Sequence, residues 1–204
     1  MSAEFLAFAP ETQVAVPIVP GARVTQIIQD GAMFRPIIVL ASGQATDGDI
    51  ARFFPLLQTA IDAGDPGAYT GHVLDARLPG FDAGRPQLLM QMVIEDDTVP
   101  NSTNRFFARG LGVPHVGDEL LPIGVVPHVQ KLPTANNLDA THSGGVFQYD
   151  LVWKDQGPTT QKATHGNVAA NPVAIEQTLH FVESHLAGKK TKIINPYRTL
   201  GLKK

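Results

Sequence analysis

The sequence predicts an α/β fold in which a helical insertion interrupts a parallel sheet. Strand-like and helix-like segments alternate along the chain, which is typical of parallel strands joined by right-handed crossovers. Leu88–Ile94 is apolar at nearly every position, as expected for a strand that helices cover on both faces. Near the end of the chain, Asn171, Pro172 and Gly188 mark the start and the stop of a helix.

Composition excludes several classes of protein. The chain has 204 residues, of which 43% are hydrophobic and 17% charged, so it can form one domain with a core, or one domain plus a lobe. A net charge of −3 offers no footprint for nucleic acid or an anionic membrane. No apolar run approaches the roughly 20 residues that a membrane span needs. Without cysteine there is no disulfide, thiolate metal site or cysteine nucleophile, and the compartment stays open.

The first 80 residues are mostly helical around one short strand. Residues 1–9 look like the end of a helix that Pro10 stops. Thr12–Val19 is β-rich and predicts a short strand, in which Pro17 weakens or ends the pairing. Residues 22–80 follow as a helical stretch. Its clearest helix, Asp49–Ala63, has these residues on one face: Ile50, Phe53, Phe54, Leu57, Ala60 and Ile61.

The second half alternates strands and helices. After the strand Leu88–Ile94, Asn101 can cap a helix that ends before Gly112. Residues 113–143 are rich in Pro, Gly, Asn and His and are hard to assign to any regular element. Val146–Trp153 predicts a strand with large side chains on one face, and in the last helix one apolar stripe contains Ile175, Leu179, Val182 and Leu186. The basic tail is interpreted as a solvated end: Lys189, Lys190, Lys192, Arg198, Lys203 and Lys204.

Two loops contain the candidate catalytic residues. Asp96 and Asp97 follow the strand Leu88–Ile94, and in open parallel sheets the working residues lie beyond the carboxyl ends of the strands. His165 lies in a loop about 70 residues later, before the last helix. Acid before histidine is the chain order of α/β hydrolases, in which the acid orients the imidazole. Asp96 is the preferred acid, with Asp97 facing solvent or capping the turn; the simpler interpretation is two solvated acids at a helix start.

The other histidines do not indicate a metal site. None follows the His-Glu-x-x-His pattern. Those in the irregular segment 113–143 lack the spacing of zinc ligands. We therefore expect no metal and no cofactor. The remaining histidines are His72, His115, His128, His142, His180 and His185.

Three segments together resemble a known family. MVIEDDTVPN is similar to the acid loop of bacterial esterases and lipases of the α/β-hydrolase fold, usually Gly-x-x-Asp-x-x-Val-Pro. Asp96 falls on the acid position, and Val93 stands where that loop has Gly. THGN before a capped helix is similar to the family's histidine loop, which His165 matches. MSAEFLAFAPETQVAVPIVPG is similar to the family's segment after the nucleophile elbow, which contains the end of the elbow helix and then the sixth strand.

The resemblance implies a partial hydrolase core, made of the later strands of the sheet. Residues 1–21 and 81–204 would form the C-terminal part of that core, and 22–80 a helical cap between the sixth and seventh strands. The substrate implied is a small-molecule ester or a lipid-like molecule. In the family, the nucleophilic serine and both oxyanion donors lie upstream of these segments. The chain thus resembles a C-terminal half, or fragment, beginning at a Met within the elbow helix.

No serine of this chain stands in a Gly-x-Ser-x-Gly turn. Ser143 beside Gly144-Gly145 is the best candidate, although a Gly-rich turn explains it as well. Ser42, Ser102 and Ser184 lack the elbow context. Hydrolysis by this chain alone is therefore not expected.

Three hypotheses follow from this incomplete triad. In the first, the chain is the C-terminal portion of a serine ester hydrolase and pairs with an N-terminal half, or with itself, through an exposed edge strand. In the second it is a non-catalytic, hydrolase-like binding module, and in the third a metal-dependent hydrolase.

Overall fold

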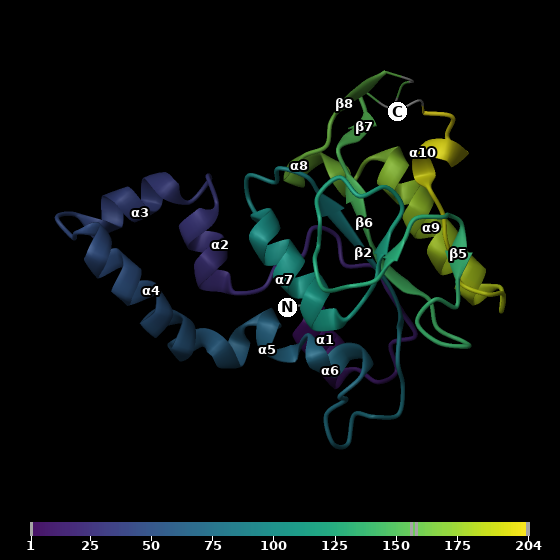
Figure 1. The fold of residues 1–204 in the computed structure, drawn as a ribbon, viewed down its shortest axis with the longest axis horizontal. Coiled ribbons are helices and arrows are strands. Elements are labelled where there is room, and N and C mark those ends of the chain that lie inside the picture. The colour runs from purple at the N-terminus through teal and green to yellow at the C-terminus, as the bar shows by residue number, and fades with distance from the viewer. Residues whose placement is uncertain (1, 156, 158, 203–204) are drawn as a thin grey trace.

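The fold is α/β, as the alternation of elements predicted. The computed structural model describes residues 2–155, 157 and 159–202; Met1, Lys203 and Lys204 lie outside this part. A five-stranded sheet has the order β1-β2-β6-β3-β4, and each neighbouring pair is parallel (Figure 1). Its strands are β1 (Val14–Ala15), β2 (Gln87–Val93), β6 (Gly144–Tyr149), β3 (His115–Val116) and β4 (His128–Val129).

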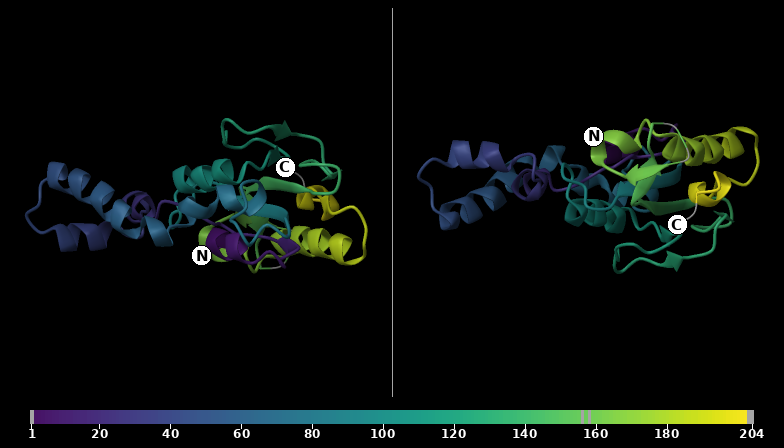
Figure 2. Two further views of the ribbon diagram at one scale, coloured as in Figure 1. Left: turned by 90° about the horizontal axis from the view of Figure 1, so that it is seen from below. Right: turned by 90° about the horizontal axis from the view of Figure 1, so that it is seen from above.

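Helices cover both faces of the sheet. On one face Leu88, Met90 and Met92 of β2 pack with α1 (Ser2–Phe8) and α7 (Asn101–Leu111). On the other face Leu89 and Val93 pack with α9 (Pro172–Leu186), and Figure 2 shows α7 and α9 on opposite sides. Every residue of β2 is buried, which confirms the expectation for its continuous apolar run.

Several predicted strands are shorter than expected. In Thr12–Val19 only Val14–Ala15 forms a strand, and an isolated bridge pairs Ile18 with Gln91 beyond Pro17. Val146–Trp153 is not one strand. It divides at Asp150 into β6 and β7 (Leu151–Trp153), and β7 pairs antiparallel with β8 (Thr160–Lys162) as a hairpin. Within 113–143, where no element was predicted, β3 and β4 extend the sheet, and β5 (Thr134–Ala135) pairs with β9 (Lys192–Ile193).

The helical stretch 22–80 has a projecting part and a packed part. The elements α2 (Val24–Asp30), α3 (Arg35–Ser42) and α4 (Asp47–Ile61) form a lobe that extends away from the sheet in Figures 1 and 2. Beyond the short helix Asp62–Gly64, α5 (Pro66–Tyr69) and α6 (Gly71–Leu74) pack against α1 and α7. The division into two domains stays a prediction.

Asp65 joins the lobe to the core. Its carboxylate accepts hydrogen bonds from the backbone N–H of Arg23 and Val24 at the start of α2. It also caps α5 by accepting from the N–H of Gly67 at 2.7 Å. Because one buried carboxylate satisfies donors from both ends of the lobe, these two ends are held together at its base.

The face that α9 buries differs from its apolar stripe. The buried residues are Val173, Ala174, Gln177 and Phe181, whereas Ile175, Leu179 and Leu186 are 38, 49 and 74% exposed. A polar network explains this orientation. Gln177 accepts a hydrogen bond from the Tyr149 hydroxyl at 2.7 Å and from the Gln91 amide at 3.2 Å, both from the sheet. Its own amide donates to the Ile194 carbonyl. After α9, β9 leads to α10 (Pro196–Thr199).

Candidate active site

The acid loop begins where β2 ends. Ile94 still donates its N–H to the Tyr149 carbonyl at 2.9 Å, and Glu95 then turns the chain with a left-handed φ of 56°. This turn directs Asp96 inward, where its side chain is 0% exposed. One carboxylate oxygen of Asp96 accepts from the N–H of Thr98 and of Val99, both at 2.9 Å. The loop thus holds the carboxylate in a fixed orientation.

Asn101 secures this loop and is not the helix cap that we predicted. The N-cap of α7 is Pro100, and Asn101 is its first helical residue. The Asn101 side chain accepts from the Glu95 N–H at 2.8 Å and donates to the Val93 carbonyl at 2.7 Å. It also donates to Asn104, which reaches the Pro20 carbonyl after β1. The Asn101 side chain turns toward the acid loop because the left-handed conformation of Glu95 leaves its N–H in need of an acceptor.

A hairpin carries the histidine back over the same end of the sheet. After β7 and β8, the Ala163 N–H donates to the Asp150 carbonyl at 2.8 Å. His165 then opens the short helix α8 (His165–Val168). Asn167 accepts from the Thr164 N–H at 2.8 Å and donates to the Lys162 carbonyl at 3.0 Å. These bonds fix the backbone on both sides of His165.

Asp96 and His165, 69 residues apart in sequence, are in contact. The second carboxylate oxygen of Asp96 lies 2.9 Å from His165 Nδ1. The His165 side chain is 31% exposed, and no group in the described part of the chain hydrogen-bonds its Nε2. Because an ionised carboxylate can only accept, this contact favours the tautomer with the proton on Nδ1. Nε2 is then a free lone pair directed away from the acid.

Asp97 does not take part in this pair. It is exposed, and within the described residues its carboxylate accepts only from the neighbouring Thr98 hydroxyl, while its carbonyl accepts from the Met33 N–H at 3.4 Å. Of the two adjacent acids, Asp96 is therefore the one that contacts His165. Asp97 instead connects the acid loop to the turn between α2 and α3.

An ion pair joins the two loops beside the Asp96–His165 contact. Lys162 Nζ lies 2.6 Å from a Glu95 carboxylate oxygen. Its hydrogen bond and its charge lower the pKa of Glu95 below the ordinary value. Both side chains are more than half exposed, so the pair contributes little stability. It does connect the residue before Asp96 to β8. No local pattern signals this pairing, because the two residues are distant in the chain.

No serine in the described part of the chain is hydrogen-bonded to His165. Ser143 is fully buried at the amino end of β6, whereas Asp96 and His165 lie beyond the carboxyl ends of the strands. Its hydroxyl donates to the Thr191 carbonyl at 2.6 Å and accepts from the Asn136 N–H at 2.7 Å. This pattern makes Ser143 a structural residue. Ser42 and Ser184 bond backbone carbonyls in their own helices, and Ser102 faces Asp30 at 3.5 Å.

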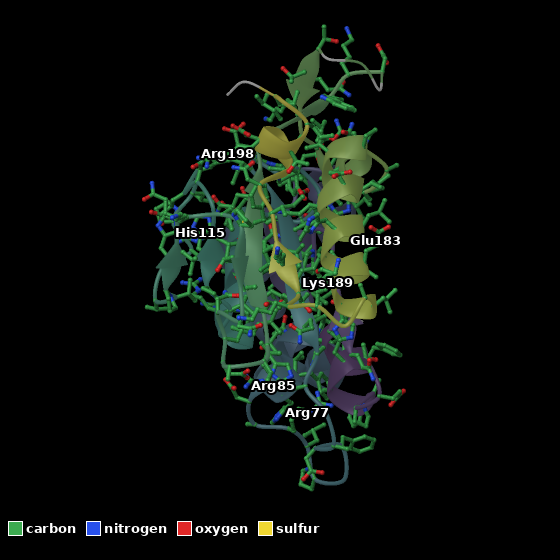
Figure 3. All side chains as sticks on the ribbon, turned by 90° about the vertical axis from the view of Figure 1, so that its right-hand side faces the viewer. Arg77, Arg85, His115, Glu183, Lys189 and Arg198 are labelled. Atoms are coloured by element: carbon green, nitrogen blue, oxygen red, sulfur yellow. The ribbon has the colours of Figure 1, made fainter. Side chains whose placement is uncertain are left out.

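A second acid–imidazole contact lies at the opposite end of the sheet. Asp139 Oδ2 is 2.9 Å from His142 Nδ1 and equally close to Arg85 Nη1. Backbone hydrogen bonds, first from Thr141 and then from His142, hold the Asp139 pKa well below its ordinary value. In Figure 3, Arg85 lies toward the end of the molecule opposite the β7–β8 hairpin. We interpret this cluster as one that stabilises the loop, since the Asp139 carboxylate already binds Arg85, His142 and the backbone N–H of Thr141.

The histidines and helices of the chain were also considered as sites for a metal ion or a membrane span. Within the described residues, no group of three or more His, Asp or Glu side chains is placed to hold a metal ion. His115 and His128 stack, with ring centroids 4.8 Å apart, on adjacent strands β3 and β4. Among the described helices, none is long and apolar enough to cross a bilayer. Comparisons with known protein families, curated proteins and solved structures gave no match for this chain.

Proposed function

We propose that this chain supplies the acid and the general base of a serine carboxylic-ester hydrolase, and that the nucleophilic hydroxyl comes from another polypeptide segment. The observation that carries the proposal is the 2.9 Å contact between buried Asp96 and partly exposed His165, whose Nε2 has no partner in the described part of the chain. The substrate is a small-molecule ester or a lipid-like ester. Asp96 and His165 take the roles that the family resemblance implies.

The reaction assigns one task to each atom. Nε2 of His165 accepts the proton of the nucleophilic hydroxyl while the hydroxyl oxygen attacks the ester carbonyl. The Asp96 carboxylate stabilises the resulting imidazolium through Nδ1–H. The proton then passes from Nε2 to the departing alkoxide, which leaves as the alcohol. Water hydrolyses the acyl-enzyme by the same steps, with Nε2 again acting first as base and then as acid.

Two exposed features support a polypeptide partner. In the sheet β1 is an edge strand, hydrogen-bonded to β2 on one side and to no strand of the described chain on the other. An edge of this kind presents backbone donors and acceptors to another strand. The exposed stripe of α9 adds apolar area on the outside of the sheet. We propose an N-terminal half of the hydrolase as the partner, with self-association as the competing outcome.

The test is reconstitution. The polypeptide encoded directly upstream is co-expressed with this chain, and hydrolysis of p-nitrophenyl butyrate by the purified complex is measured. We expect His165→Gln to reduce kcat by about 10⁴-fold or more. The matched control His72→Gln alters a histidine of α6, away from the acid loop, and leaves kcat within about twofold. An upstream polypeptide without Gly-x-Ser-x-Gly, or hydrolysis unaffected by His165→Gln, contradicts the proposal.

The alternative is a non-catalytic, hydrolase-like binding module. It is favoured by one observation, that no described serine is hydrogen-bonded to Asp96 or His165. Under this alternative the chain binds an apolar ligand or a partner, and the reconstituted complex shows no hydrolysis that depends on His165. The same kinetic experiment therefore separates the two functions.

A further inference from the structure

The projecting lobe contains an apolar groove. It has a volume of about 590 Å³ and lies among α2, α3 and α4. Its apolar lining includes Ile28, Ile37, Ile38, Ile50, Phe54 and Leu57. All of its lining residues come from the lobe and its turns, so the groove is separate from the Asp96–His165 contact. Its volume falls within the range of sites that bind small molecules.

The groove is not filled by the lobe's own side chains. In α3 no residue is buried, and Ile37 on its groove side is 62% exposed. Across the groove, Phe53 of α4 is 56% exposed, although Phe54 beside it is buried. Apolar side chains that face each other across an open groove gain free energy when an apolar group displaces the water between them.

The charges around the groove restrict what can enter it. Asp49 is its one charged lining residue among those described, and no Lys or Arg lines it. The Asp49 carboxylate already accepts from the hydroxyl and the N–H of Thr46 in a capping box. The one cation beside it in the described part of the chain, Arg52, lies 3.9 Å from the Asp49 carboxylate, is 83% exposed and does not line the groove. A ligand carboxylate or phosphate inside the groove would therefore meet no lining cation and would face the Asp49 carboxylate. An uncharged ligand meets neither penalty.

We propose that this groove binds a single neutral aliphatic chain, such as the chain of a long-chain alcohol or of an uncharged ester. Identifying that chain as part of the substrate rests on the proposed function, whereas the binding itself does not. The connection is structural. The helix α2 lines the groove through Ile28, and in the turn that follows it the Met33 N–H donates to the Asp97 carbonyl of the acid loop. Asp30, the last residue of α2, faces Ser102 of α7.

The experiment titrates the full chain with n-alkanols from hexanol to dodecanol, followed by NMR of isoleucine δ1-methyl groups. Four of these methyls report on the groove, and those of Ile123 and Ile193, buried in the core, serve as internal controls. We expect shifts confined to Ile28, Ile37, Ile38 and Ile50. Affinity should rise about fourfold per added methylene until the groove is filled. The affinity for decanoate should be at least about tenfold lower than the affinity for decanol.

Matched variants make the test specific. Ile38→Asp places a charge in the groove and should abolish the shifts. Leu56→Asp places the same charge on α4 at a residue that is 71% exposed and outside the groove, and should bind decanol normally. Ala41→Phe, at a lining position, should shorten the longest chain accepted. This variant keeps the test valid if Ile38→Asp does not fold.

Three results would overturn the proposal. The first is binding without dependence on chain length, and the second is equal affinity for decanoate and decanol. The third is that a second copy of the chain covers the groove. In that case the lobe methyl signals shift with protein concentration alone, and sedimentation shows a dimer that Ile38→Asp dissociates. None of these measurements involves hydrolysis. If the chain binds decanol but the reconstituted complex is inactive, the proposed function is disproved and the proposal about the groove still stands.

Discussion

Asp96→Asn changes one oxygen of the buried carboxylate to an amide and keeps its size. The carboxylate accepts three hydrogen bonds, from Thr98 N–H, Val99 N–H and His165 Nδ1, and its side chain is 0% exposed. In the variant, the amide oxygen keeps the two backbone donors, so the amide NH₂ points at Nδ1. Nδ1 must then become an acceptor, and the imidazole proton moves to Nε2. The base that the proposed mechanism needs is thereby lost.

The cost in stability follows from the same contacts. A hydrogen bond to a charged group contributes about 1.5–3 kcal/mol and a neutral one about 0.5–1.5 kcal/mol. Three such exchanges sum to about 3 kcal/mol, and relief from burying a charge offsets part of this loss. We therefore expect Asp96→Asn to lower the free energy of unfolding by about 1–2 kcal/mol.

Two assays check this prediction. Long-range ¹H–¹⁵N NMR of His165 at pH 8 should show the proton on Nδ1 in the wild type and on Nε2 in the variant. Urea unfolding gives the change in stability. Asp97→Asn, at the exposed neighbouring acid, is the control and should change neither readout. A wild-type imidazole with its proton on Nε2, or an unchanged tautomer in Asp96→Asn, would refute the assigned contact.

The remaining predictions concern the supports of the site and of the sheet. Asn101→Ala removes the bonds to Glu95 N–H and Val93 carbonyl, and should lower the free energy of unfolding by about 1–3 kcal/mol in urea and speed amide exchange at Glu95. Ser143→Ala leaves the Asn136 N–H without its acceptor and should cost about 1–3 kcal/mol, with kcat of the reconstituted complex unchanged; a lost kcat would restore Ser143 as nucleophile. Burial, and then the charge of His128, lower the pKa of His115 below its ordinary 6.5. As the pH falls, the unfolded chain therefore takes up the His115 proton before the folded chain does. The free energy of unfolding contributed by the neutral imidazole is fully present above about pH 6.5. Below that pH it should fall by up to about 1 kcal/mol per pH unit, until the pH passes the folded-state pKa. Urea midpoints at pH 7.5 and 5.5 should show a smaller difference in His115→Gln than in the wild type.

The sequence was sufficient where one strong local signal dominates. The continuous apolar run of β2 predicted a buried parallel strand, and its position then predicted that the following acid loop lies at the carboxyl edge of the sheet. From that geometry, an acid and a histidine after successive strands were expected to be near each other, and Asp96 and His165 are in contact. Their catalytic role stays a proposal.

The rest depended on tertiary contacts that no local pattern encodes. β3 and β4 are two residues long and exist through their pairing with neighbouring strands. Asn101 has the residue type and position of a cap, but the left-handed Glu95 offers its side chain a better partner. In α9 the polar Gln177 is buried and Leu186 is exposed, because the sheet presents Tyr149 and Gln91 to that helix.

The most direct test of the central claim is covalent labelling of the reconstituted complex with a serine-directed fluorophosphonate, with intact mass spectrometry of each polypeptide as the readout. We predict that this chain stays unmodified while a serine of its partner is phosphonylated, at a rate that His165→Gln reduces and His72→Gln does not. Phosphonylation of Ser143, or of any other serine of this chain, would contradict the proposal that the nucleophile comes from another segment.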